Sequence, residues 1–375
     1  MRTTALTVLL LFASQLLAAG PFPKFKAVTI DPNIGKVCYA VTVADVNNDG
    51  KKDIVAVSEN RVLWYENPSW KPHVIIADQT PRDNVCIAPM DIDGDGKVDF
   101  ALGAGWTKIG TIHWLRRNKS LKDKWQVRMI AKERWLHRMR WADVLGKGKK
   151  QLVISPLNKT AGEGVRLTAF EIPKDPTKDR WPSTVLDASL NRMHNHWHRK
   201  RSKFAPALTL TASVEGVHLI IKRPTGFFKF KIPGSQAAGE IKFGKIDKKQ
   251  HYFATVEPMH GTALVVYGVG NNQIAKPPRY VIDKGFRRGH ALWTADFDGD
   301  GDDDIAFGHS DTPKTHGVIV YEAQSLGKWK KHVIDAGGIA TEDLIVADFN
   351  GDGRPDIVAG GRKTHNVKLY LNMRK

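Results

Sequence analysis

The chain has 375 residues, of which 26% are charged and 42% are hydrophobic, with 33 glycines and 19 prolines. This composition is typical of a folded globular protein and excludes a disordered, collagen-like or coiled-coil chain. The formal net charge of +18 favours an anionic partner, although it carries no information about the fold.

The N-terminus has the pattern of a secretory signal peptide. Arg2 supplies a positive charge, and an apolar stretch that ends in small residues follows it. A membrane anchor is the alternative, but the apolar run is shorter than the ~20 residues that a spanning helix needs, and Ser14 and Gln15 interrupt it. We expect residues 1–19 to be removed and the protein to be secreted or periplasmic, with no membrane span.

An acidic pattern, D-x-[DN]-x-D-G-x-x-D, recurs along the chain. Its intact copies begin at Asp45, Asp91, Asp296 and Asp348. Each copy lies between two alternating apolar stretches, which predicts a β-hairpin closed by the acidic loop. Degenerate copies that we place at Asp143, Lys200 and Gly244 fill the gap between the second and third intact copies. The sequence therefore contains seven repeats.

Each hairpin is followed by further strand patterns. A third strand is predicted at Val62–Tyr65, Thr111–Trp114, Leu167–Phe170, Val217–Ile220, Leu264–Tyr267, Val318–Tyr321 and Val367–Tyr370. A fourth, flanked by Trp or Pro, recurs in several repeats but not after the seventh, and Phe25–Ile30 has the missing pattern. We therefore predict an all-β fold: one domain over residues 25–375, a seven-bladed β-propeller of four-stranded antiparallel blades, closed by pairing of its N- and C-terminal strands.

The acidic hairpins resemble FG-GAP/VCBS repeats, the calcium-binding blades also found in integrin alpha propellers. The stretches His290–His309 and Glu342–Asn366 are more similar to the propeller part of aldos-2-ulose dehydratase-like proteins. This resemblance implies β-elimination from a keto sugar: a base removes the proton next to a carbonyl, a cation stabilises the enolate, and the β-oxygen leaves with the help of an acid.

The intact loops have the ligands of a calcium site. Positions 1, 3, 5 and 9 supply side-chain oxygens, and Gly at position 6 allows a sharp turn around one hard cation. We expect up to four structural Ca²⁺ ions, held by Asp45, Asn47, Asp49, Asp53, Asp91, Asp93, Asp95, Asp99, Asp296, Asp298, Asp300, Asp304, Asp348, Asn350, Asp352 and Asp356. The alternative is an Asx-turn that satisfies only its own backbone, which we expect for Asp143. Lys147 and Lys248 replace the third acid, so blades 3, 4 and 5 are predicted to be metal-free.

Residues six positions before each loop should lie at the opposite end of the ring, where the central channel opens. Around the ring this mouth position is occupied by Tyr39, Val85, His137, His194, Ala238, His290 and Glu342. Imidazole is a metal ligand and a general acid or base near neutral pH, so we expect a functional site here. Capping of strand ends by individual histidines is the alternative.

The candidate residues for proton transfer or for binding an additional divalent metal are His137, His194, His290, Glu342 and His309. Guanidinium groups recognise carboxylates and sulfates and stabilise enolates. Candidate substrate-binding residues are therefore Arg138, Arg140 and Arg82, together with His196 and His260 on the same face.

Two functions stay open at this point. One is a carbohydrate lyase or dehydratase that acts on a keto sugar or acidic saccharide, and the other is a non-catalytic module that binds a polysaccharide or a protein. In both cases the partner is a carbohydrate or another anionic ligand rather than nucleic acid, for which no recognition motif is present. Cys38 and Cys86 form either one disulfide between the first two blades or two buried thiols.

Overall fold

The computed structural model describes residues 21–107, 109–160, 164–200, 202, 205–270, 276–310 and 315–374. The expected signal peptide, residues 1–19, lies outside these described residues. Within them, every regular element is a β-strand. No helix in this part of the chain is long and apolar enough to cross a membrane.

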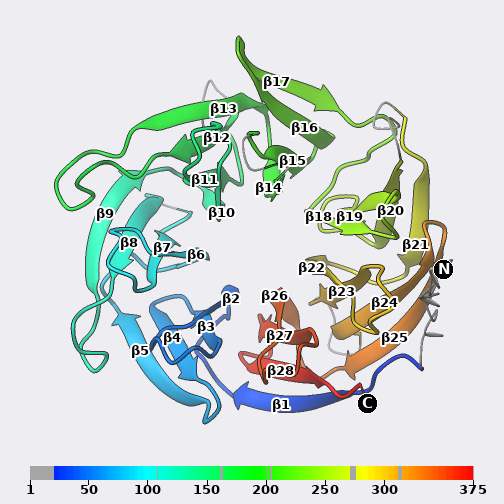
Figure 1. Cartoon of the computed structure of the whole chain (residues 1–375), viewed down its shortest axis with the longest axis horizontal. Helices are drawn as coiled ribbons and strands as arrows, with labels where there is room; N and C mark the ends of the chain where they lie inside the picture. Colours follow the sequence, from blue (N-terminus) through cyan, green and yellow to red (C-terminus); the bar gives the residue numbers. More distant parts are fainter. Residues whose placement is uncertain are drawn as a thin grey trace, which may run out of the picture.

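Seven four-stranded antiparallel sheets stand around a central axis, as the repeats predict (Figure 1). Blades 1 to 3 consist of β2 (Ala40–Ala44), β3 (Asp53–Val57), β4 (Arg61–Glu66), β5 (Lys71–Ala77); β6 (Cys86–Met90), β7 (Asp99–Ala104), β8 (Thr111–Arg116), β9 (Gln126–Lys132); and β10 (Leu136–Ala142), β11 (Gln151–Pro156), β12 (Val165–Phe170), β13 (Ser183–Leu190). Blades 4 to 6 consist of β14 (Met193–Arg199), β15 (Leu208–Ser213), β16 (Gly216–Arg223), β17 (Gly226–Lys231); β18 (Glu240–Lys245), β19 (His251–Glu257), β20 (Ala263–Val269), β21 (Arg279–Lys284); and β22 (Gly289–Ala295), β23 (Asp304–His309), β24 (Gly317–Ser325), β25 (Lys328–Ala336). In each blade the first strand lies nearest the axis.

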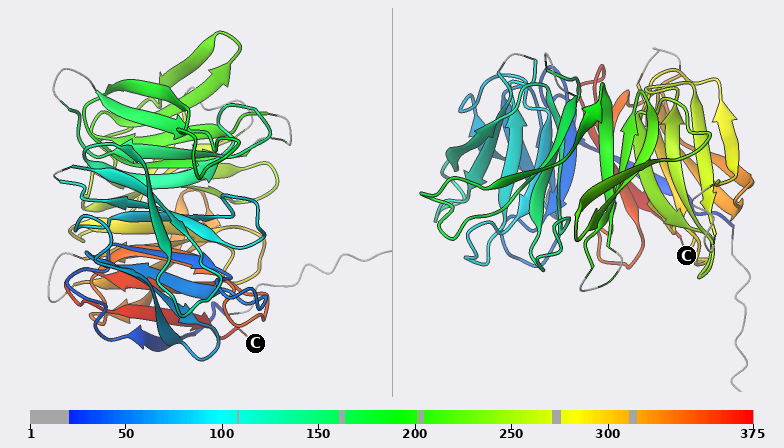
Figure 2. Two further views of the ribbon diagram at one scale, coloured as in Figure 1. Left: turned by 90° about the vertical axis from the view of Figure 1, so that its left-hand side faces the viewer. Right: turned by 90° about the horizontal axis from the view of Figure 1, so that it is seen from above.

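Blade 7 joins the two ends of the chain. It combines β26 (Thr341–Ala347), β27 (Asp356–Gly361) and β28 (Val367–Asn372) with β1 (Phe25–Asp31), which pairs antiparallel with β28 from Phe25 opposite Asn372 to Asp31 opposite Val367. The expected closure of the ring is therefore present. Figure 2 shows the ring edge-on, with hairpin turns gathered at its two faces.

The hydrophobic core lies between neighbouring blades, because the middle strands are covered on both faces. All five residues of β3 are buried, and Val55 and Trp64 of blade 1 pack in one cluster with Phe100 and Leu102 of blade 2. Continuous apolar runs are expected for strands buried on both faces. The stacking of blades thus holds the inner strands rigidly around the axis.

Four of the inner strands contain a β-bulge at the mouth position. The pairing registers shift at His137, His194, His290 and Glu342. A bulge places one extra residue in a strand and redirects its side chains, so the mouth residue and its successor can both face the channel. The structure records no such shift in the inner strands of blades 1, 2 and 5.

The fifth repeat differs from the predicted register. Gly244, expected as the first loop residue, lies inside β18 and pairs with Tyr252, and the hairpin closes one step later between Lys245 and His251. The turn is therefore shorter than the acidic loops, and Lys248 in it has no counterpart among their ligand positions. Gly239 rather than Ala238 takes the mouth position, since its N–H bonds to Val256 as that of Tyr39 bonds to Val57.

Both cysteines are buried and carry free thiols. Of the two alternatives for Cys38 and Cys86, the structure therefore has the unbridged one. Burial raises the pKa of the Cys86 thiol to about 12 and that of Cys38 as well, so neither is a reactive thiolate.

Candidate functional site

The acidic loops gather oxygen atoms at one end of the ring. One carboxylate oxygen from each of Asp91, Asp93 and Asp99 lies within 4.8 Å of the other two, and the same holds for Asp296, Asp298 and Asp300. In the first and seventh blades Asn47 and Asn350 stand at the second ligand position. Oxygen clusters of this kind could each hold a hard cation.

The ninth residue of each loop also fastens the hairpin to its blade. Asp304 is buried and accepts hydrogen bonds from the N–H groups of Phe297 (3.0 Å) and Ala323 (2.8 Å). Burial, with the charges of Asp298 and Asp302 adding to it, raises the pKa of Asp304 to about 9. Crowded, buried carboxylates have this property when no cation offsets their repulsion.

The degenerate loop of blade 3 keeps the fold of the hairpin without the acids. Asp143 accepts hydrogen bonds from Gly146 and Gly148, which is the Asx-turn geometry expected for it. The ammonium group of Lys147 forms an ion pair with the carboxylate of Glu171 (2.7 Å). The amide oxygen of Gln151 accepts a hydrogen bond from the backbone N–H of Val144. This loop therefore needs no cation to close.

Histidines from three blades and one turn meet at the opposite end of the ring. The rings of His194 and His260 lie 3.8 Å apart between centroids, those of His260 and His290 4.7 Å, and those of His137 and His194 4.6 Å. One nitrogen from each of His194, His260 and His290 lies within 4.8 Å of the others. Three imidazoles in this arrangement could coordinate a transition metal and leave a position open.

Backbone carbonyl groups of the next blade orient two of these rings. The Nδ1 atom of His194 donates to the carbonyl of Gly239 (2.5 Å), and that of His290 donates to the carbonyl of Glu342 (2.5 Å). Each acceptor is the mouth residue of the following blade. Fixing the proton on Nδ1 leaves Nε2 with a free lone pair, as in metal-binding histidines, and the buried Nε2 of His194 has no partner among the described residues.

Burial keeps the imidazoles neutral. It lowers the pKa values of His137, His194, His260 and His290, and neighbouring cations such as Arg138 lower them further. Neutral imidazole is the form that binds metals and accepts protons. Both ring nitrogens of His137 are buried without a partner in the described part of the chain.

A small cavity of about 90 Å³ opens between these histidines. Tyr39, Trp106, Arg288, Glu342 and Arg362 are also part of its wall, together with Val85, Arg138 and Leu157. The carboxylate of Glu342 accepts a hydrogen bond from Arg362 at 2.6 Å and lies 3.6 Å from Arg288. The histidine cavity thus combines basic imidazoles with guanidinium groups that can receive negative charge.

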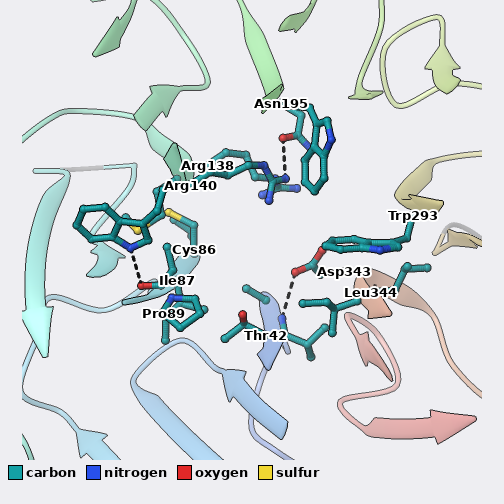
Figure 3. Close-up of a pocket in the computed structure, with 18 of the residues that line it drawn as sticks. Thr42, Cys86, Ile87, Pro89, Arg138, Arg140, Asn195, Trp293, Asp343 and Leu344 are labelled. Atoms are coloured by element: carbon teal, nitrogen blue, oxygen red, sulfur yellow. Dashed lines mark hydrogen bonds between the residues drawn. The ribbon is translucent and has the colours of Figure 1, made fainter. Parts of the chain in front are cut away.

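A larger cavity of about 320 Å³ occupies the channel between the histidines and the acidic-loop end (Figure 3). Residues three positions before the loops line it in every blade: Thr42, Ala88, Arg140, Trp197, Lys242, Trp293 and Ile345. In Figure 3, Arg138 and Arg140 extend from one side of this channel cavity, and Asp343 and Trp293 lie on the other. Arg138 lines both cavities.

A comparison with protein-family models matches the FG-GAP-like repeat at residues 45–102 and 296–359. The chain carries FG-GAP-like repeats. These two segments contain all four intact acidic loops and the strands next to them. The remaining blades complete the propeller. No curated protein matches the chain. The similarity to aldos-2-ulose dehydratase-like proteins stays a resemblance of sequence motifs.

Several of the candidate residues lie outside the histidine cavity. His309 stacks on Phe307 and lines neither cavity, and His196 is buried with its ring nitrogen 2.9 Å from the hydroxyl of Ser155. Arg82 is exposed beside Asp78, 3.6 Å away. Arg140 lines the channel cavity only, whereas His260 belongs to the histidine cluster itself, with His194 and His290.

The channel position was not considered in the sequence prediction, although the repeats contain its signal. Buried inner strands of a propeller should be apolar, yet Arg140 and Lys242 occupy equivalent places in blades 3 and 5. Lys242 becomes equivalent to Arg140 only after the one-residue shift of the fifth repeat. With the correct register of the fifth repeat, the charged residues at this one inner position would have predicted the channel cavity.

Proposed function

We propose that this propeller is a metal-dependent carbon–oxygen lyase that performs β-elimination on a keto sugar or an acidic saccharide. The observation that carries the proposal is the cluster of His194, His260 and His290, whose ligand nitrogens lie within 4.8 Å of one another. A divalent metal held there would act as a Lewis acid on the carbonyl or carboxylate oxygen of the substrate.

The residues around the cluster fit the other tasks of an elimination. His137 is neutral and both of its ring nitrogens lack a partner among the described residues, so it can take the proton next to the carbonyl. The C–O bond at the β-carbon then breaks as the C=C bond forms, and the leaving oxygen takes up a proton. Tyr39 lines the same cavity, and burial next to Asp83 raises its pKa to about 12, so it carries the proton that the leaving oxygen needs.

The guanidinium groups supply charge stabilisation. Arg288 and Arg362 line the cavity, and each has only the carboxylate of Glu342 as its recorded acidic partner in the described residues. Fixed positive charge in a site shielded from water stabilises an enolate as it develops. The cavity has room for an ion and one functional group, so the saccharide would lie across the mouth with its carbonyl directed inward.

The test combines metal analysis of the purified protein with a screen of keto sugars and acidic glycans for ultraviolet absorbance of the unsaturated product. We expect His194→Ala and His290→Ala to lose metal and activity together, and His137→Ala to keep the metal and lose at least about a hundredfold in kcat, the size typical of a lost general base. His309→Gln is the matched control and should keep both. Full activity in all three alanine variants would refute the proposed site.

A non-catalytic binding module is the second candidate, and one observation favours it. Trp197 and Trp293 lie edge to face, with centroids 5.3 Å apart, in the wall of the channel cavity. Aromatic rings in protein pockets commonly bind apolar or sugar surfaces. Retained glycan binding without turnover in the same screen would select this function.

We also propose that the acidic loops bind structural Ca²⁺ and that the protein is exported. The oxygen clusters of blades 2 and 6 support the first part, because carboxylate oxygens are the ligands that Ca²⁺ prefers; backbone carbonyl groups and water would complete its roughly 6–8 ligands. The N-terminal charge and apolar stretch support the second. N-terminal sequencing of protein recovered outside the cytoplasm should find a start near Ala19; a retained Met1 would refute export by cleavage.

A further inference from the structure

The channel cavity holds more positive than negative charge. Four cationic residues, Arg138, Arg140, Lys150 and Lys242, line it together with only two carboxylates among the described residues, Glu240 and Asp343. The carboxylate of Asp343 already accepts the backbone N–H of Val41 (3.1 Å), and the cations outnumber the two carboxylates even when both are ionised. Buried charge without compensation is unfavourable unless a counter-ion is present.

The ammonium group of Lys242 is the least satisfied of these cations. The side chain is 3% exposed, and its Nζ atom lies 3.9 Å from the nearest carboxylate oxygen, on Glu240. The structure records no hydrogen bond from this ammonium group within the described residues, although it carries three donors. It lies over the Trp197 ring, 4.5 Å from the centroid, and borders the open cavity.

Glu240 is engaged elsewhere. Its carboxylate lies 3.1 Å from His194 and 3.6 Å from Arg138. Glu240 therefore shares one negative charge among His194, Arg138 and Lys242.

Arg140 has donors left for a ligand. Its Nε atom donates to the carbonyl of His196 (2.9 Å) and Nη2 donates to the amide oxygen of Asn195 (3.1 Å). These bonds fix the plane of the guanidinium group, and the structure records none from Nη1 within the described residues. Burial lowers the pKa of Arg140 to about 10 and also that of Lys242, and the charge of Arg138 lowers both further, which is the electrostatic cost of burying cations side by side. An anion between them would offset this cost.

The remaining wall is largely apolar. Val41, Ile87, Pro89, Leu344 and Trp293 line the same space of about 320 Å³. A fork of guanidinium and ammonium groups at one side and apolar surface at the other suits a compact organic acid better than a bare inorganic ion.

We propose that the channel cavity is a binding site for a carboxylate-bearing ligand of monosaccharide size, whose carboxylate lies between Arg140 and Lys242. Neither residue lines the histidine cavity, so this site is separate from the proposed elimination centre. Loss of lyase activity and loss of carboxylate binding are therefore independent results.

The test is calorimetric titration of the purified full-length protein with sodium D-glucuronate, D-glucose and sodium sulfate in Tris buffer of low ionic strength. We expect glucuronate to bind at least about tenfold more tightly than glucose or sulfate, since only glucuronate combines the charge and the ring. Equal affinity for glucuronate and glucose would overturn the proposal. Sulfate binding as tightly as glucuronate would also overturn it, in favour of an inorganic ion.

The matched variants are Lys242→Met, which keeps the length of the side chain, and Lys132→Met on the exposed face of β9. Glucuronate affinity should fall about tenfold or more in the first and stay unchanged in the second. A measurement on the wild-type protein does not depend on the folding of variants: glucuronate should slow reductive methylation of Lys242, but not of Lys132, in peptide mass spectra. Unchanged methylation of Lys242 at saturating glucuronate would refute the site.

Discussion

At the scale of single residues, His113 shows how burial affects a side chain outside both cavities. It lies in β8 with 7% of its surface exposed, its Nε2 atom is 2.9 Å from the hydroxyl of Thr111, and its Nδ1 atom has no partner in the described part of the protein. Burial lowers its pKa to about 4. The folded protein therefore keeps this imidazole neutral at a pH where the unfolded chain binds a proton.

The sign of the resulting pH dependence follows from linkage. Below the unfolded pKa of about 6.5, the unfolded state binds more protons than the folded state, so the free energy of unfolding falls with falling pH until the folded pKa is reached. His113→Gln keeps a polar contact and does not titrate. Between pH 7 and pH 4 we expect the free energy of unfolding of the wild-type protein to fall by roughly 3 kcal/mol more than that of this variant. Urea unfolding at several pH values measures it. An identical pH profile in wild type and variant would contradict the expectation.

The individual site residues were predictable where the repeat alone fixes their place. His137, His194 and His290 occupy one repeated position, so counting from the acidic loops was enough to place them together. His260 follows a strand end and depends on how one turn folds, and His309 lies near the same end of the ring but outside the cavity. Spacing within a repeat carries no information on the direction of a loop side chain.

At the scale of elements, the bulges explain what strand alternation alone could not predict. In a regular strand His137 and Arg138 would face opposite sides. With the register shift between Leu136 and Arg138, both line the histidine cavity. The same shift in blade 7 lets Glu342 line one cavity and Asp343 the other. The order of residues was readable from the sequence, but the local deformation that doubles the polar lining was not.

The acidic loops allow a matched test of the proposed calcium sites. Asp296 and Asp143 both accept hydrogen bonds from two loop glycines, but only Asp296 has further acids beside it. We expect calcium to raise the melting temperature of the wild-type protein by a few degrees, since an ion at a hundred times its Kd adds about 2.7 kcal/mol.

Asp296→Asn should reduce this calcium-dependent shift, and Asp143→Asn should leave it unchanged. Differential scanning calorimetry with calcium and with a chelator measures both. A melting temperature that does not respond to the chelator would refute a structural role for calcium. Equal shifts in the two variants would show that the acids act only on their own backbone.

At the scale of the whole molecule, one strand closes the ring. β1 pairs with β28 along its whole length, and the hydroxyl of Tyr65 in blade 1 donates to Asp31 at 2.6 Å. We expect deletion of residues 21–31 to lower the melting temperature by more than about 10 °C, because blade 7 then presents an unpaired edge and loses its contact with blade 1. A synthetic peptide of residues 21–31 added to the truncated protein should restore part of the loss, and a scrambled peptide should not. An unchanged melting temperature after deletion would contradict this role of β1.

The overall architecture was the most predictable level, because seven copies of one pattern leave few alternatives. Only the fifth repeat was misplaced, by one residue, since its turn lacks the acids that mark the others. Because of this one-residue error, Lys242 was not predicted to be among the residues that line the channel. A repeat protein thus reveals its fold through what its units share, and its specific chemistry through the units that deviate.

The pairing of β1 with β28 also sets an order of events during synthesis. The first strand of the described chain has no partner until the last blade has been made, so the ring can lock only when the final residues, near Asn372, are available. Both cavities draw their walls from blades that include the first and the seventh, through residues such as Tyr39, Thr42 and Glu342. A growing chain therefore cannot complete either cavity before its last blade has been made, and a ligand that needs the whole wall of a cavity can bind only after the ring has closed.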